Sequence, residues 1–168
     1  MTDEMLRIRS YLQVQGAKLT PAQIVEKVKA AMAEVRTALF AVPAERFGSR
    51  PSGQEWSANE VMAHVVTAGA HFGGGIIRIL DGGSAEAPVA DRIETDVPLR
   101  PAAEWWSLLE RDRNVLFERV ERADPNVHLD RSIGHSMFGP LTWREALLFL
   151  RLHDLDHAGQ LRKIAEGA

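Results

Sequence analysis

Three capping boxes constrain the fold of this sequence most strongly, because each one marks the start of a helix. In a capping box, a Ser or Thr hydroxyl accepts the backbone N–H three residues on, and a Glu or Gln there accepts the N–H of the cap. The pairs are Thr20 with Gln23, Ser57 with Glu60, and Thr142 with Glu145. Apolar residues then recur every three or four positions, which predicts amphipathic helices over about 20–42, 57–80 and 142–164.

Two further segments have helical patterns. From about Pro101, apolar residues recur at helical spacing until Asp124-Pro125, which predicts a fourth long helix. Met5 to Leu12 predicts a short additional helix, and no segment shows clear strand alternation. Three connections are long for a compact bundle: 43–56, 81–100 and 124–141. We therefore expect an all-α fold, a four-helix bundle with long crossover connections and a short extra N-terminal helix.

Composition sets limits on the class of protein. The chain has 168 residues, of which 45% are hydrophobic and 26% charged, as in one soluble globular domain spanning residues 1–168. The net charge of −3 and the absence of a long basic run argue against a nucleic-acid partner. The acidic start, without an apolar leader or a membrane-spanning segment, predicts a cytoplasmic protein that does not contact membranes.

Histidines carry the clearest functional signal. His153 and His157 lie four apart on the apolar face of one predicted helix, so both imidazoles can reach one ion. His64 lies on the inward face of the 57–80 helix. Spacing and placement leave two interpretations equally open, which are a set of core histidines hydrogen-bonded to neighbours and a three-histidine site for a divalent metal. The chain has no cysteine, so any metal must rely on His and carboxylate ligands.

Three motifs resemble the DinB/YfiT-like metalloprotein superfamily. The run Trp56 to Val65 is similar to that superfamily's W-S-x-x-E-x-x-x-H, and His153 to Leu161 is similar to its H-x-x-x-H-x-G-Q-L. Gly139 to Thr142 resembles the turn before its fourth helix. The likeness extends over about residues 20–164, and the order and spacing of its motifs favour the metal site over core histidines.

The resemblance implies a four-helix bundle, often a homodimer, with a divalent metal on His64, His153 and His157. Zinc or nickel is the metal we expect, with iron and manganese as alternatives. The best understood branches of the superfamily are transferases and isomerases that use a low-molecular-weight thiol, so the resemblance implies such a thiol as cosubstrate and a small molecule as substrate. Since chemistry varies among members, the resemblance specifies the site better than the reaction.

Three functions follow from such a site. The first is a thiol-dependent S-transferase, in which the sulfur nucleophile comes from a cosubstrate because the chain has no cysteine. The second is a small-molecule hydrolase that activates water, since His153 to His157 superficially resembles the H-E-x-x-H of zinc proteases, with Asp154 in place of the Glu. The third is a metal-binding or interaction bundle without turnover.

Other residues have a functional and a simpler interpretation. His71 lies two turns after His64 and is a candidate for a channel, although a core or surface histidine is the simpler interpretation. Asp112 or Arg113 could point inward to orient a ligand or contact substrate, but a solvated pair is simpler. For Asp154 beside the paired histidines, an outward orientation is simpler than a contact with them. Gly73-Gly74-Gly75 predicts a break or a close helix crossing.

Overall fold

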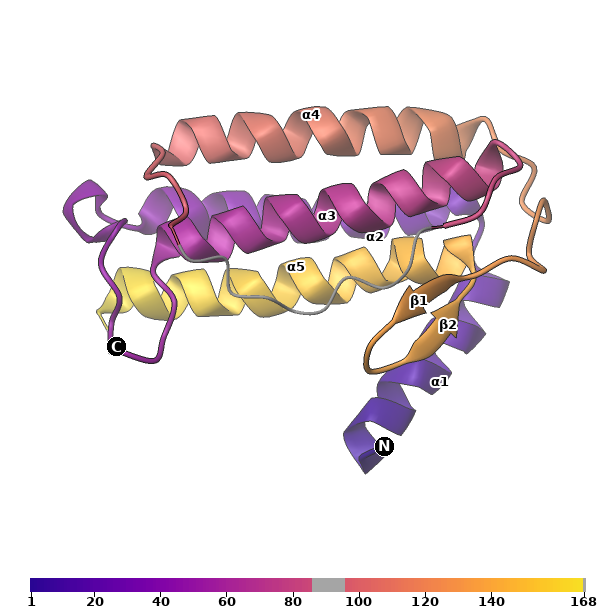
Figure 1. Cartoon of the computed structure of the whole chain (residues 1–168), viewed down its shortest axis with the longest axis horizontal. Helices are drawn as coiled ribbons and strands as arrows, with labels where there is room; N and C mark the ends of the chain where they lie inside the picture. The colour runs from indigo at the N-terminus through magenta and orange to yellow at the C-terminus, as the bar shows by residue number, and fades with distance from the viewer. Residues whose placement is uncertain (86–95, 168) are drawn as a thin grey trace.

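The computed structural model describes residues 1–85 and 96–167, and within them the chain is mostly helical (Figure 1). The elements in chain order are α1 (Asp3–Lys18), α2 (Pro21–Ala41), the short 3-10 helix η1 (Ala44–Arg46), α3 (Ala58–Leu80), α4 (Ala102–Glu121), β1 (Ile133–His135), β2 (Gly139–Leu141) and α5 (Trp143–Glu166). The predicted all-α fold is therefore confirmed.

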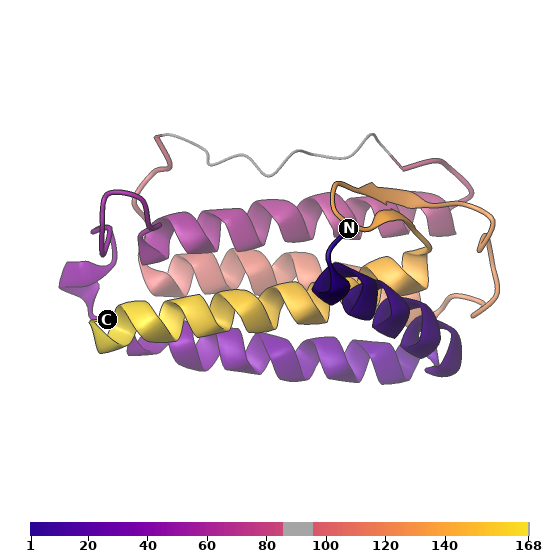
Figure 2. The same cartoon turned by 90° about the horizontal axis from the view of Figure 1, so that it is seen from below.

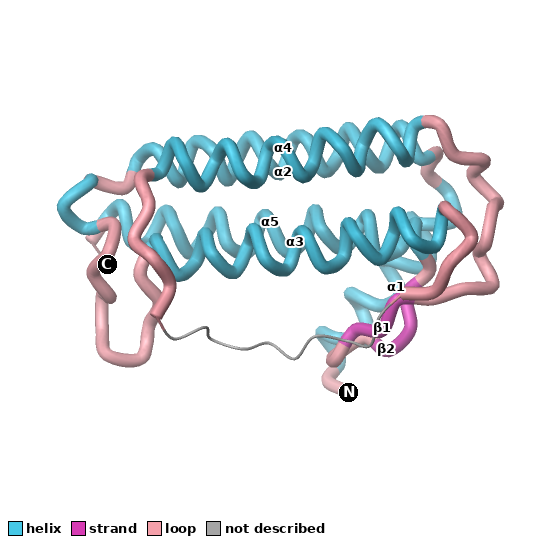
Figure 3. Tube along the Cα trace, turned by 45° about the horizontal axis from the view of Figure 1, so that its top comes forward, coloured by secondary structure: helices cyan, strands magenta, loops and turns pink. Residues whose placement is uncertain are grey.

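The four long helices α2 to α5 lie side by side as a bundle (Figures 1 and 3). Helix α2 packs most extensively on α5, and α3 packs on both α4 and α5. The colours of Figure 1 show that α3 and α4 run in the same direction, so α4 begins at the end of the bundle opposite to the one where α3 ends. The connection between them therefore links opposite ends of the bundle, as the predicted crossover topology requires.

All three capping boxes form as predicted. The hydroxyls of Thr20, Ser57 and Thr142 each accept the backbone N–H three residues on, at 3.2 Å in every case. The Gln or Glu at that position accepts the N–H of the cap in return. These reciprocal bonds fix the first turns of α2, α3 and α5, the three helices that form most of the core.

Helix α1 and the connection 124–141 differ from the sequence prediction. Helix α1 is longer than Met5 to Leu12 because Thr2 caps it, with its hydroxyl accepting the Met5 N–H, and because its packing on α5 stabilises turns with a weak apolar pattern. In the connection 124–141, β1 and β2 form an antiparallel hairpin with Ile133 opposite Leu141. Strands of three residues are too short to show alternation in sequence.

The hairpin lies over the ends of α3 and α5, on the side where α1 packs (Figure 2).

Helix α3 continues without a break through Gly73, Gly74 and Gly75, so the predicted break is wrong. A Cβ at Gly75 would lie 3.3 Å from Cδ1 of Ile133 in β1. The glycine therefore permits a close approach, but the approach is made by a strand rather than by a helix.

A buried ion pair joins α4 to α5 inside the bundle. Arg113 Nη1 and Nη2 donate to the two carboxylate oxygens of Asp154 at 2.7 and 2.8 Å, and the two side chains are 1% and 0% exposed. A Cβ at Gly69 of α3 would lie 3.3 Å from Arg113 Nη2, so a larger residue there would crowd the guanidinium against that helix. The solvated interpretation of Arg113 and the outward one of Asp154 are therefore wrong: a bidentate pair at a helix crossing can bury two charges that periodicity assigns to solvent.

No helix in the described part of the chain combines the length and the apolar character needed to cross a bilayer.

Removing one partner of the Arg113–Asp154 pair should strongly destabilise the bundle. We expect Arg113→Met to lower the free energy of unfolding by about 3 to 5 kcal/mol, because it leaves the Asp154 carboxylate buried without a partner. The double variant Arg113→Met/Asp154→Leu should lose less than the sum of the two single changes. Urea unfolding followed by circular dichroism measures both.

The exposed pair Arg122 and Glu118 on α4 provides the matched control, since both side chains are more than half exposed. Arg122→Met should cost less than about 1 kcal/mol. A similar cost for Arg113→Met and Arg122→Met would contradict the role assigned to the buried pair.

Glu60 should make stability depend on pH. Hydrogen bonds from Arg50, with Nε 3.0 Å from Oε2, lower the pKa of Glu60 from 4.5 to about 2. A carboxyl whose pKa is lower in the folded state stabilises the fold above pH 4.5, and this contribution is lost as the pH falls toward 2. Glu60→Gln should therefore cost about 1 kcal/mol at pH 7, and the difference from wild type should narrow below pH 4.5 in urea unfolding curves. Glu110→Gln, at an exposed position of α4, should show no such narrowing.

Candidate metal centre

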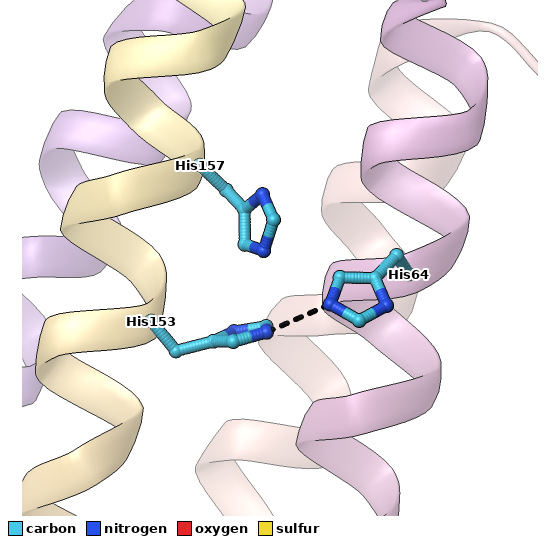
Figure 4. A group of neighbouring side chains, drawn as sticks. All are labelled: His64, His153 and His157. Atoms are coloured by element: carbon cyan, nitrogen blue, oxygen red, sulfur yellow. Dashed lines mark hydrogen bonds between the residues drawn. The ribbon is translucent and has the colours of Figure 1, made fainter. Parts of the chain in front are cut away.

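The three predicted ligands converge at the contact between α3 and α5 (Figure 4). His64 projects from α3, and His153 and His157 project from α5. The Nε2 atoms of His64 and His153 lie 3.0 Å apart, and the ring centroid of His157 lies 4.9 Å from that of His64 and 4.5 Å from that of His153. One nitrogen of each ring lies within 4.8 Å of the others, so the cluster could hold a metal ion.

The environment of His153 suits a ligand that must be neutral. The pKa of His153 is well below its usual 6.5, and burial is the largest cause. Positive charge on nearby side chains lowers it further: on His157 and His64 when they are protonated, on Arg113, and on His135 when it is protonated. The imidazole is therefore uncharged at neutral pH, and a neutral imidazole has the lone pair that a metal binds.

Gln160 orients His157. The Nδ1 of His157 lies 2.9 Å from Oε1 of Gln160, one helical turn further along α5. An amide oxygen only accepts, so Nδ1 carries the proton and the lone pair lies on Nε2, the nitrogen that Figure 4 shows directed toward the other two rings. Such a hydrogen bond fixes both the tautomer and the orientation of a metal-binding histidine. The donor set and its tautomer thus fit a divalent metal.

Trp56 borders the cluster just before α3 begins. Its ring centroid lies 4.9 Å from that of His64, and it stacks on His157 at 6.2 Å with 13° between the planes. The indole therefore restricts the orientations that two of the three imidazoles can adopt. It also covers one side of the cluster with an apolar surface.

A cavity of about 760 Å³ opens beside the cluster. Its described lining comes from α1, the segment before α3, α3, the hairpin and α5: Ile8, Trp56, His64, Ala68, Phe72, Gly134, His135, Ser136, Met137, Phe138, Phe149, Leu152, His153, Leu155, Asp156 and His157. This volume lies within the range of small-molecule sites, which are mostly apolar with a few polar groups that fix orientation. A ligand in the cavity would contact the three imidazoles directly.

The other candidate residues lie outside the cavity lining. Asp154 binds Arg113 with both oxygens and is 0% exposed, so it is not placed to act as the base that the H-E-x-x-H comparison would require. Asp112 is one-third exposed and pairs with Arg111 at 3.5 Å. His71 is half-buried and contacts Phe72 edge to face at 5.3 Å, but it does not line the cavity.

Sequence reasoning missed several residues around the site. Gln160 and Trp56 both lie inside the quoted motifs, and their fixed offsets from His157 and His64 were a signal for a supporting role. Gly69 and His135 carried no such signal. The space that Gly69 provides and the position of His135 in the cavity depend on how α4 and the hairpin pack.

Comparison with known proteins agrees with the fold. A solved structure described as the crystal structure of TT2238, a four-helix bundle protein, superposes with a TM-score of 0.65 at 20% sequence identity, covering 85% of this chain and 98% of that one. At this identity the likeness shows the fold alone. No curated protein sequence matches the chain significantly. The profile of the DinB superfamily matches residues 15–161, which include all three histidines of the cluster, and the chain therefore belongs to the DinB superfamily.

Proposed function

We propose that this protein is a divalent-metal-dependent transferase that joins a low-molecular-weight thiol to a small electrophile. The observation that carries the proposal is the convergence of three imidazoles from two helices beside a cavity of about 760 Å³. His64, His153 and His157 would hold the metal. A divalent cation lowers the pKa of a thiol or water that it binds, which supplies a nucleophile at neutral pH.

The number of ligands supports catalysis over a purely structural role. Structural zinc sites are closed by four protein ligands, whereas catalytic sites use three and leave a position for water or substrate. Among the described residues the cluster has three members, and the cavity lies on its open side. A cosubstrate can therefore reach the point on which the three rings converge.

The choice of a thiol as the cosubstrate is supported by the composition together with the family resemblance. The chain has no cysteine, so a sulfur nucleophile must enter as a separate molecule. In the proposed reaction the thiol loses its proton to solvent, its sulfur forms a bond to an electrophilic carbon, and the leaving group departs with the electron pair of the bond that it formed with that carbon. Residues of this chain bind and orient the reactants: Gln160 keeps His157 in one tautomer, and Trp56 and the apolar cavity lining exclude water.

Loss of one imidazole should remove most metal binding without unfolding the bundle. We expect His157→Ala to weaken zinc or nickel binding by at least about 100-fold, and Gln160→Ala to weaken it by about 10- to 100-fold, because the tautomer and orientation of His157 are then no longer fixed. Isothermal titration of the metal into metal-free protein, prepared without an affinity tag, measures both. Circular dichroism checks that the helices persist.

His71→Ala is the matched control, because His71 is half-buried on the same helix as His64 but lies outside the cluster. It should bind metal as wild type does. Equal binding by the His157 and His71 variants would show that the metal occupies some other site.

The thiol should interact with the site only when the metal is present. We expect cysteine, glutathione or 2-mercaptoethanol to bind the metal-loaded protein, and their S-methyl derivatives, which have no ionisable proton on sulfur, to bind more weakly. The rate of coupling of the thiol to 1-chloro-2,4-dinitrobenzene, followed by the absorbance of the thioether, should exceed the uncatalysed rate only when metal is bound, and this excess should be lost in His157→Ala.

These measurements separate the three functions considered from the sequence. Thiol-independent release of product would identify a hydrolase instead. The third possibility is a metal-binding bundle without this activity. It would be identified by tight metal binding together with titration heats that neither the free thiols nor their S-methyl derivatives change.

A further inference from the structure

We propose that the cavity beside the histidine cluster takes an uncharged, planar aromatic molecule, and that this molecule is the electrophile of the reaction proposed above. The identification as electrophile rests on that proposed function. The class of ligand rests on the cavity wall alone and is tested without the metal.

One wall of the cavity is built from aromatic rings in mutual contact. The ring of His135, in the hairpin, lies 4.7 Å from Phe138 and 4.6 Å from Phe149 of α5, and stacks on Phe72 of α3 at 5.7 Å. Phe72 and Phe149 also meet at 5.1 Å. All four side chains line the cavity. Because ring faces and edges attract other rings in stacked or edge-to-face geometry, such a wall favours a planar aromatic ligand.

The aromatic wall leads directly to the reactive point. Phe149 lies 5.7 Å from the ring of His153, and Trp56 borders the cluster beside His64 and His157. A planar molecule lying on the wall would therefore extend toward the three imidazoles. This places one end of the ligand beside the nucleophile and the rest of it among apolar side chains.

The charges in the described lining disfavour an anionic ligand at the wall. No Lys or Arg contributes to the lining in the ranges 1–85 and 96–167, and its one carboxylate, Asp156, is exposed. The Nδ1 of His135 accepts the N–H groups of Met137 and Phe138 at 3.1 and 3.3 Å, so this nitrogen offers no N–H to an anion. An anion at the wall would lose its hydration without gaining a cationic partner there.

The test uses two fluorescent probes that differ by one charge. N-phenyl-1-naphthylamine is neutral, and 8-anilino-1-naphthalenesulfonate has the same ring system with a sulfonate added. We expect the neutral probe to bind metal-free protein at one site, more than about tenfold more tightly than the sulfonate, because burial of an unpaired charge is costly. Fluorescence titration gives both dissociation constants.

Filling the cavity should weaken binding of the neutral probe. Ala68 lines the cavity, and Thr67 is exposed one residue earlier on the same helix. Ala68→Trp should weaken binding by at least about tenfold, and Thr67→Trp should leave it unchanged. Near-equal affinities in these two variants would mean that the probe binds elsewhere on the surface and would overturn the proposal.

A cation placed in the cavity should reverse the preference. Leu152 lines the cavity and is half-buried, so Leu152→Lys should shift the ratio of affinities toward the sulfonate by at least about tenfold. Val115→Lys, at a position of α4 that is 57% exposed and outside the cavity, should leave the ratio unchanged.

The outcomes distinguish this inference from the proposed function. Equal or tighter binding of the sulfonate to wild-type protein would overturn the ligand class, while metal and thiol binding would still support the transferase. Selective binding of the neutral probe together with no metal binding at the cluster would overturn the transferase and leave an aromatic-binding cavity.

Discussion

The contact of α3 with α5 is the constraint on which the rest of the site depends. It places His64 of one helix opposite His153 and His157 of the other, and no local segment could bring the three rings together. The bidentate Arg113–Asp154 pair ties α4 to α5 where Gly69 lets the guanidinium lie against α3. Three helices are thus held in one register next to the cluster, because a buried pair tolerates little displacement before its charges lose their hydrogen bonds.

Two neighbouring residues of α5, His153 and Asp154, have different roles in this arrangement. His153 contributes to the cluster, while the next residue, Asp154, points its carboxylate into the bundle and binds Arg113. The helix therefore uses one face for the site and the adjacent face for fixing its position. The same guanidinium helps to keep His153 uncharged, since its positive charge is one of the causes that lower the pKa of that ring.

The small elements outside the bundle shape the cavity beside the histidine cluster. Helix α1 and the hairpin close one end of the space beside α3 and α5, and the hairpin adds the ring of His135 to the phenylalanines of the two helices. Without these elements the histidines would lie on an open helix surface. A mostly apolar cavity next to three imidazoles suits a reaction in which water must be kept from a reactive nucleophile.

The sequence by itself determined the four long helices and the three histidines, because caps and periodicity are local signals within one helix. The order and spacing of the motifs also identified the family. Only the tertiary structure decided that Arg113 and Asp154 are buried, that Gly75 admits a strand, and that His135 joins the cavity. Each of these depends on a partner more than 40 positions away in the chain, and periodicity along one helix carries no information about such partners.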